Sequence, residues 1–317
     1  MIQYRSLQHN DVAGIIEGWN QNIWCDPLTE TRFKNLILCD PNFDPEGLII
    51  AEENGEILGA LYALRRRVPM FGTELESDSG WITWFFVKDQ AQRKGIGSQL
   101  LQKALLFLKK NKIKTVYFAS YAPNYIVPGL DKNAYPEAYS FLMKNGFQKD
   151  YEAVAMDRNI VNYNYPEEVK EIKKQRESEG YSFEVVTKDA IPSASWFAHE
   201  KFNEDWGRAI REGLVRNVNE EQIIIARNPE KEIIGFTMFG GYEGIRERFG
   251  PFGVDENLRG LGIGKILLHE CLFKQKQVGV HNSWFLWTGE ESAAGFLYRK
   301  YGFEITRRFE IMYRTVN

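Results

Sequence analysis

The sequence predicts an α/β protein built from two similar domains in tandem. Its length of 317 residues suits two domains of ordinary size better than one. A unit of apolar strand, glycine loop and helix also occurs twice. The matching glycines, Gly95 and Gly262, lie 167 residues apart (262 − 95 = 167), and the apolar positions of the helices that follow keep the same offset. A glycine loop that is repeated together with its helix predicts two copies of one fold.

The predicted elements of the first copy follow from apolar spacing and from turn signals. Two apolar runs joined at Asn54-Gly55 predict a β-hairpin, because this dipeptide adopts the positive φ angles of a two-residue turn. A nearly continuous apolar run before the first glycine loop predicts a central strand. In chain order the elements are strand 2–7, helix 12–20, hairpin strands 48–52 and 56–64, central strand 81–87, helix 98–111 and strand 114–120.

A long insert follows the strand at 114–120. Residues 121–136 contain three prolines, which is too many for a helix or a central strand, so we expect a loop. Loops of this length are more often functional than idle. The tyrosines of the insert, Tyr121, Tyr125 and Tyr135, could line a pocket or simply pack the loop against the domain.

The end of the first copy is predicted from a strand and a charged helix. Residues 152–160 predict a strand that closes the first copy. Residues 166–180 begin with proline, end with glycine and are densely charged, which predicts a solvated surface helix that connects the copies. The predicted division is therefore an N-terminal domain at 1–165, a linker helix at 166–180 and a C-terminal domain at 181–317.

The second copy repeats the order of the first. Its predicted elements are strand 183–187, helix 193–211, hairpin strands 222–227 and 232–239, a central strand that ends at Val254, a helix from Ile266, strand 284–288, helix 292–301 and final strands to about residue 315.

The glycine loop of the second copy is suited to an anion. Gly260, Gly262 and Gly264 alternate between the central strand and the helix. The N–H groups of a helix's first turn have no internal partners and lie at the positive end of its dipole, while glycine lets the backbone approach a phosphate closely. Arg259 adds a permanent positive charge beside this cradle. The same arrangement recurs at Gly95 and Gly97.

The spacing of these loops excludes two common nucleotide motifs. The dinucleotide fingerprint needs Gly-x-Gly-x-x-Gly, and the P-loop needs glycine where Arg259 stands and serine or threonine where Ile266 stands. The pattern that fits is Arg/Gln-x-x-Gly-x-Gly, which starts at Arg259 in the second copy and at Gln92 in the first.

A second pattern lies downstream of each loop. The second copy has Ala294-x-x-x-Tyr298-x-x-x-Gly302-Phe303, and the first has Ala138-x-x-x-Leu142-x-x-x-Gly146-Phe147. With these motifs in this order, covering about half of each copy, the sequence resembles the GNAT superfamily of N-acetyltransferases, in two tandem copies. The resemblance implies that each domain has a mixed, mostly antiparallel sheet, flanked by helices, with a splayed central strand pair.

The resemblance also implies the co-substrate and the reaction. GNAT proteins transfer an acetyl group directly from acetyl-CoA to an amine, here expected to be the primary amine of a small molecule. The pyrophosphate would lie on the cradle N–H groups, and a backbone N–H of the strand ending at Val254 would stabilise the developing oxyanion. The residues so assigned are Val87, Gln92, Arg93, Lys94, Gly95, Ile96, Gly97 and Ser98 in the first copy and Val254, Arg259, Gly260, Leu261, Gly262, Ile263, Gly264 and Lys265 in the second.

Tyr298 is the predicted catalytic residue. It stands four residues before Gly302, where the family places the proton donor for the departing thiolate, and a tyrosine hydroxyl can donate a proton. It could instead be a tyrosine that packs its helix. The first copy has Leu142 at this position, which donates no proton, so we expect chemistry in the second copy. By the same resemblance, His199 and Trp206 lie on the substrate-side helix.

Composition limits the other partners. Net charge is −3, which argues against nucleic acid or an anionic membrane as a partner. Three cysteines and four histidines show no metal-ligand spacing, so no metal is expected, and Cys271 lies on the core face of its helix. No apolar run reaches the roughly 20 residues that span a bilayer, and no signal core opens the chain, so we expect a soluble cytoplasmic protein.

Three other functions remain open from the sequence. The protein could be a non-catalytic acyl-CoA sensor, it could acetylate a peptide or protein amine, or it could be an interaction scaffold whose glycine loops are only turns. The sequence does not fix the acceptor, the general base, the acyl-chain length, the number of working cofactor sites or the oligomeric state.

Overall fold

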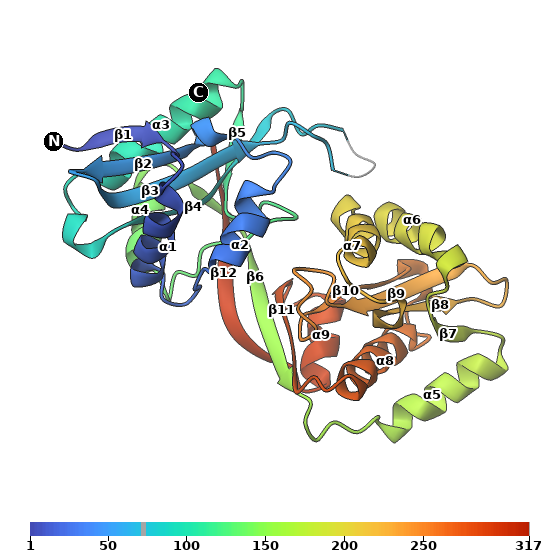
Figure 1. Cartoon of the computed structure of the whole chain (residues 1–317). Coiled ribbons are helices and arrows are strands. Elements are labelled where there is room, and N and C mark those ends of the chain that lie inside the picture. Colours follow the sequence, from blue (N-terminus) through green and yellow to red (C-terminus); the bar gives the residue numbers. More distant parts are fainter. Residues whose placement is uncertain (71–73, 317) are drawn as a thin grey trace. The chain divides into compact units, whose positions relative to one another are not determined.

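The computed structural model describes residues 1–70 and 74–316 of a mixed α/β chain. The chain divides into two compact units. The first is built on Met1–Pro69, Glu74–Ala153 and the segment from Arg307 onward, and the second on Val154–Thr306. Each unit contains β-strands flanked by helices (Figure 1), which confirms the predicted fold class.

The first unit is a twisted sheet with the strand order β1-β2-β3-β4-β5-β12. Its neighbours pair antiparallel except β4 and β5, which are parallel. Its elements are β1 (Gln3–Ser6), α1 (Asp11–Asn22), α2 (Glu30–Phe33), β2 (Leu48–Glu53), β3 (Glu56–Arg65), β4 (Ser79–Val87), α3 (Ile96–Lys110), β5 (Thr115–Phe118), α4 (Pro136–Lys144), the first part of β6 (Gln148–Asn159) and the end of β12 (Glu304–Thr315).

The two faces of this sheet carry separate hydrophobic cores. Residues of α1 and α2 pack on one face with Tyr62 and Trp84, and residues of α3 and α4 pack on the other with Leu61 and Ile82. This division follows from the alternation of side chains along a strand. The predicted hairpin is confirmed, because Asn54 and Gly55 join β2 to β3 with φ angles of 54° and 83°.

The second unit repeats the arrangement with an antiparallel sheet in the order β10-β9-β8-β7. Helices α6 and α7 cover one face of this sheet and α8 the other, as Figure 1 shows. Its elements are α5 (Glu167–Ser178), β7 (Ser182–Val185), α6 (Ile191–Lys201), α7 (Glu204–Val215), β8 (Ile223–Arg227), β9 (Ile233–Phe239), β10 (Phe249–Val254), α8 (Ile263–Gln277), β11 (Asn282–Thr288) and α9 (Ala293–Lys300).

The two long strands β6 and β12 correct one prediction. Residues 152–160 do not close the first copy, because Val154–Asn159 pairs antiparallel with β11 of the second unit. The closing strand of the first unit is instead the end of β12, where Met312 to Thr315 pair with β5. Local apolar spacing predicts a strand but not its partner, which explains the error. The boundaries at 165 and 180 stay a prediction, while compactness divides the chain near residues 153 and 306.

The helix predicted at 193–211 is two helices. α6 ends at Lys201 and α7 begins at Glu204, because Phe202 leaves the helical conformation (φ −131°, ψ −79°). Asn203 then caps α7, with its side chain accepting a hydrogen bond from the backbone N–H of Trp206 at 3.1 Å. The apolar spacing continues across this break, so it hid the boundary.

Helix α5 is exposed along most of its length, but one side of it packs on the second unit. Val169 is fully buried, and α5 packs along α8. Lys173 forms an ion pair with Glu270 of α8 (2.8 Å), and Glu168 accepts a hydrogen bond from the Tyr301 hydroxyl (2.7 Å). The charged residues that predicted a solvated helix are therefore partly used for contacts within the second unit.

The insert at 121–136 is a loop, as predicted, and it is held against the first unit. Tyr121 is buried, and the Tyr135 hydroxyl donates a hydrogen bond to Asp26 at 2.8 Å. Arg307 of β12 joins Asp26 (2.5 and 3.0 Å) to Asp131 of the insert (2.9 Å). Of the two roles open for the insert's tyrosines, Tyr121 and Tyr135 take the packing role.

Candidate functional site

The central strands separate in both copies, as expected. In the first copy, β4 pairs with β5 only from Ser79 to Ile82, and the last bond between them runs from the Ala119 N–H to the Ile82 carbonyl (2.9 Å). In the second copy, β10 and β11 meet at one bridge, Arg248 with Trp284, and no ladder is described beyond it. In each copy, no strand of the described residues covers this edge of the C-terminal part of the central strand.

Each central strand also carries a β-bulge before it ends. In the first copy, Thr83 is the extra residue between the β3–β4 pairs Tyr62–Trp84 and Ala63–Ile82. In the second copy, the register between β9 and β10 shifts between Phe249 and Phe252. Position 250 lies 167 residues after position 83, so the bulges match. A bulge re-aims the backbone, which suits a strand that must present N–H groups at an open edge.

The ends of these strands present backbone groups to that edge. The Lys88 N–H bonds the Leu58 carbonyl, and the Asp255 N–H bonds the Ile234 carbonyl, both at 2.9 Å. Because N–H directions alternate along a strand, the preceding groups at Val87 and Val254 face the open edge. The Gln92 side chain donates to the Val87 carbonyl at 3.1 Å, which joins the strand end to the glycine loop.

The first glycine loop is open and cationic. Gly95 caps α3 with φ of 81°, and no side chain caps the helix. A Cβ built on Gly95 would meet no atom of the described chain within 4 Å. Arg93 and Lys94 are exposed beside it. The structure thus brings the predicted residues Gln92 to Ser98 together around an uncapped, positively charged helix end, which fits a pyrophosphate.

The second glycine loop has a similar backbone conformation, but its side chains pack more closely on the core. Gly262 caps α8 with φ of 79°, again without a side-chain cap, and Gly260 has φ of 90°. Leu261 is half-buried and Ile263 is buried, so their side chains anchor the loop to the core. Arg259 is exposed and lies 3.8 Å from Glu256.

Helix α5 lies against this second loop. A Cβ on Gly262 would approach Cγ2 of Ile172 to 2.8 Å, so the glycine is needed for this contact. Near the same loop, the Tyr301 hydroxyl and the neighbouring Lys300 and Lys265 hold the pKa of Glu168 below its usual range. The second cradle is therefore flanked by an acidic residue of α5.

Tyr298 contacts both separated strands of the second copy. Its ring centroid lies 4.6 Å from that of Phe285 on β11 and 6.0 Å from that of Phe252 on β10. The side chain is 6% exposed, and burial raises the pKa of its phenol above the usual value of 10. The phenol is thus protonated at neutral pH and able to donate. Burial also raises the pKa of the nearby Cys271 thiol to about 12, which makes that thiol an inert core group.

The matching place in the first copy is apolar. Leu142 is fully buried, and Phe85 and Phe118 on its two separated strands contact each other with centroids 5.8 Å apart. Tyr139, one turn away on α4, is only half-buried and packs on the α3–α4 core. The first copy thus keeps the cradle without a hydroxyl at the Tyr298 position.

Gly253 and Phe202 were missed by the sequence analysis. On the α6–α7 face of the second sheet, a Cβ on Gly253 would lie 2.3 Å from the Phe202 ring, so this ring rests directly on the strand. Phe202 contacts Trp206, with centroids 4.8 Å apart. A glycine inside an apolar strand was the available signal, because it marks a close approach by another group.

The membrane and family comparisons add to this geometry. Among the described residues, every helix is too short or too polar to cross a bilayer. Residues 16–127 match a family model described as "Acetyltransferase (GNAT) family", and residues 219–305 match one described as "Acetyltransferase (GNAT) domain". Each match includes one glycine loop. A comparison with curated protein sequences finds no match.

Solved structures with low identity share the fold over the whole chain. A glucosamine N-acetyltransferase region of a fungal multi-domain β-N-acetylglucosaminidase has a TM-score of 0.82 at 16% identity over 99% of this chain, which spans only 38% of that protein. A GCN5-related N-acetyltransferase from Sphaerobacter thermophilus has a TM-score of 0.73 at 15% identity, covering 100% of this chain and 96% of that one.

A third structure is itself described as a tandem protein. It is a "Tandem GNAT protein" of the clavulanic acid biosynthesis pathway, with a TM-score of 0.66 at 14% identity over 100% of this chain and 99% of that one. At these identities the likeness shows the fold, while the two family matches fall on the two glycine loops. The chain therefore belongs to the GNAT acetyltransferases, with two copies of the family fold in tandem.

Proposed function

We propose that this protein transfers an acetyl group from acetyl-CoA directly to the primary amine of a small molecule, with the chemistry in the second copy. The observation that carries the proposal is Tyr298, which contacts both separated strands of the second copy while the first copy has Leu142. We further propose a cytoplasmic location, which imaging of a tagged full-length chain would test.

The residues of the second copy fit acetyl-CoA. The uncapped end of α8 and the exposed Arg259 suit its pyrophosphate, and the N–H of Val254 faces the open edge of β10. Acetyl-CoA supplies the activated acetyl group, and its thioester carbonyl would take a hydrogen bond from a β10 N–H. In the balanced reaction the N–C bond forms and the C–S bond breaks. The amine loses one proton and the thiolate gains one.

Tyr298 supplies that last proton or holds a hydrogen bond in its place. Its phenol is kept neutral by burial, so it donates to a developing thiolate and does not serve as the base. The amine must react as the neutral base, and we assign no side chain to its deprotonation. A second role suits the first copy, where an open cradle without a donor fits acetyl-CoA binding without chemistry.

The test is thiol release from acetyl-CoA with a panel of amines. Glucosamine comes first, because the fungal structure with the TM-score of 0.82 is described as a glucosamine N-acetyltransferase region. Tyr298→Phe should lower turnover at least ~10-fold and leave the KM for acetyl-CoA nearly unchanged. Tyr139→Phe, on the matching helix of the first copy, is the control and should leave turnover unchanged.

Three outcomes would revise the proposal. Unaltered turnover in Tyr298→Phe would remove Tyr298 from the mechanism. Binding of acetyl-CoA without thiol release for any amine would support the sensor function. Release with peptides and none with small amines would move the acceptor to a peptide or protein amine.

A further inference from the structure

The turn between α6 and α7 holds an aromatic pair beside the central strand of the second copy. Phe202 is fixed from both sides. Lys201 forms an ion pair with Asp255 (2.6 Å) in the turn after β10, and Asn203 caps α7. The ring of Phe202 covers Gly253, and Trp206 packs against Phe202 with an interplanar angle of 31°. Both rings are half-buried, so part of their surface stays open to solvent.

The pair lies opposite Tyr298 across the sheet. Gly253 stands between Phe252 and Val254, which pack with α8 and Tyr298 on the other face. Since side chains alternate along β10, Phe202 and Trp206 occupy the α6–α7 face at the same strand end. Both rings also lie 6.1 Å from the ring of Phe236 on β9, so a molecule lying on them would be over β9 and β10.

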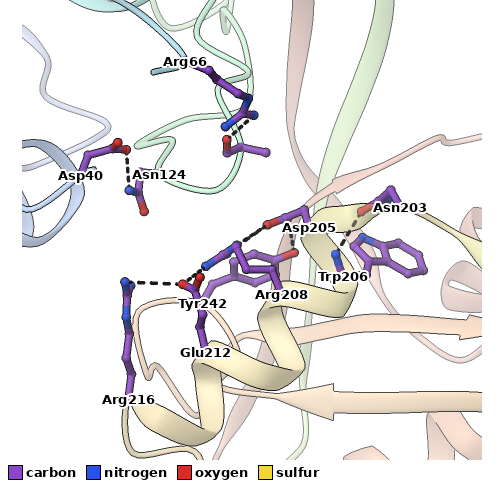
Figure 2. Close-up of polar contacts among 11 residues, drawn as sticks. Asp40, Arg66, Asn124, Asn203, Asp205, Trp206, Arg208, Glu212, Arg216 and Tyr242 are labelled. Carbon is purple, nitrogen blue, oxygen red and sulfur yellow. Dashed lines mark hydrogen bonds and ion pairs between the residues drawn. The ribbon is translucent and has the colours of Figure 1, made fainter. Parts of the chain in front are cut away.

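Polar groups flank the aromatic pair. The Asp205 carboxylate accepts from Arg208 at 3.1 and 3.0 Å and from the Tyr242 hydroxyl at 2.7 Å, as Figure 2 shows. Its side chain is 13% exposed, and it neighbours Trp206 on α7. Within the part of the chain that the structure describes, Trp206 Nε1–H donates to no protein acceptor, and it is not among the buried unpaired atoms. This donor is therefore available to a ligand.

This combination matches the chemistry of a hydroxylated ring. The C–H groups on the face of such a ring are apolar and pack on the negative face of an aromatic side chain, while its hydroxyls point outward to polar groups. Sites for small molecules commonly combine apolar walls with a few fixed polar groups. A linear amine would use neither the flat aromatic surface nor several polar partners at once.

We propose that Phe202 and Trp206 form a platform that binds the ring of a cyclic, hydroxylated primary amine of the amino-sugar class. The proposal rests on the proposed acetyl transfer and names its acceptor class. Trp206 contacts the acceptor and selects it. Phe202, pressed on Gly253, sets the position of Trp206.

The kinetic test compares a cyclic and a linear amine as acceptors. In Trp206→Ala, the KM for glucosamine should rise at least ~10-fold, while kcat and the KM for acetyl-CoA stay within ~2-fold of the unchanged chain. With ethanolamine as acceptor, the KM should change less than ~2-fold. Trp206→Phe should recover most of the glucosamine effect. Trp196→Ala is the matched control, because Trp196 lies on α6 and is 54% exposed.

A binding test separates failure of the platform from failure of the proposed function. Glucosamine is titrated against the full chain, with and without CoA, and tryptophan fluorescence is followed. The expected change persists in Trp196→Ala and is lost in Trp206→Ala, whether or not thiol is released. Equal behaviour of the two variants would overturn the platform. An equal rise in KM for glucosamine and ethanolamine would also overturn it, since Trp206 would then not select rings.

Discussion

At one matched strand position the first copy carries Phe86 and the second carries Gly253 (253 − 86 = 167). In the first copy the aromatic ring comes from the strand, is 2% exposed and packs under α1, where a Cβ on Gly18 would lie 2.5 Å from it. In the second copy the ring belongs to Phe202, in the turn between α6 and α7, and it is half-buried. The same space is filled in both copies, by a buried ring of the strand in the first and by a half-buried ring of the α6–α7 turn in the second.

Of the two glycine-loop cradles, the one in the first copy is the more open. Gly95 is exposed and has open space around it, while Gly262 is half-buried and touches Ile172 of α5. Both differences bear on the proposed division of roles between the copies. The first copy has the more open cradle, and the second has the supported cradle, the half-buried Phe202 ring and Tyr298. Because both copies keep the glycine loop, this motif alone does not distinguish them, and the surrounding packing does.

The largest expected effect is on the stability of the first unit. Phe86→Ala should lower its free energy of unfolding by about 3–5 kcal/mol, because a buried ring is replaced by a cavity. Hydrogen exchange in β3 and β4, resolved by mass spectrometry, measures this locally. Gly253→Ala, its counterpart, should instead displace Phe202 and raise the KM for the acceptor. A cost of less than about 1 kcal/mol for Phe86→Ala would mean that the Phe86 ring is not tightly packed under α1.

The next effect concerns pH and a buried histidine of α8, which packs against Tyr163, Tyr165 and Tyr301. His269 of α8 is fully buried, whereas Gln102 at the matching position of α3 is exposed (269 − 102 = 167). Burial, followed by the nearby Arg158, lowers the pKa of His269 from 6.5 to about 4. The folded chain thus binds this proton less readily than the unfolded chain. Its contribution to stability is full above about pH 6.5 and is lost as the pH falls towards 4.

The size of this pH effect is up to about 3 kcal/mol in the second unit, at about 1.4 kcal/mol for each pKa unit. Urea unfolding of the second unit between pH 4 and 7 measures it. His269→Gln should flatten this pH dependence, and Gln102→Ala should not alter it. An unchanged slope in His269→Gln would mean that other groups carry the acid sensitivity.

The parts of the fold that the sequence predicts are those set by local chemistry. The turn at Asn54-Gly55 and the helix starts at Gly95 and Gly262 follow from φ angles that few residues adopt. Because the motif is repeated, the cradle residues of one copy have their counterparts 167 positions away in the other. The loop character of the insert follows equally from its prolines.

Features set by distant partners were not predictable. Strand 152–160 has the same apolar pattern whether it pairs with the first sheet or with β11, so its partner could not be inferred. The contact of Ile172 with Gly262 joins residues 90 positions apart (262 − 172 = 90), and no periodicity within a charged helix indicates it. The roles of Tyr298 and the cradles in binding and chemistry stay predictions.

Paired glycine substitutions test whether both cradles bind acetyl-CoA. Calorimetric titration of the full chain should give about two sites. Gly95→Glu and Gly262→Glu should each weaken one site at least ~100-fold, because a side chain and a negative charge enter a loop that prefers anions. Each variant should retain one site, and the double variant none. Two sites retained in either single variant would show that the altered loop is not the binding loop.

The smallest expected effect tests whether the contact with α5 strengthens acetyl-CoA binding at the second cradle. Ile172→Ala removes the half-buried side chain that touches Gly262 and should lower stability by only about 1 kcal/mol. We expect acetyl-CoA affinity at the second site to fall about 3-fold. In the unchanged chain, contact with Ile172 already restricts the loop, so the loop loses less conformational entropy when it binds the ligand. Calorimetry in the Gly95→Glu background isolates this site, and Lys174→Ala, exposed on the same helix, is the control. A rise in acetyl-CoA affinity would mean that α5 does not support the second cradle, because Ile172 would then obstruct it. Together with the acidic Glu168, this would make α5 an inhibitor of cofactor binding in the second copy.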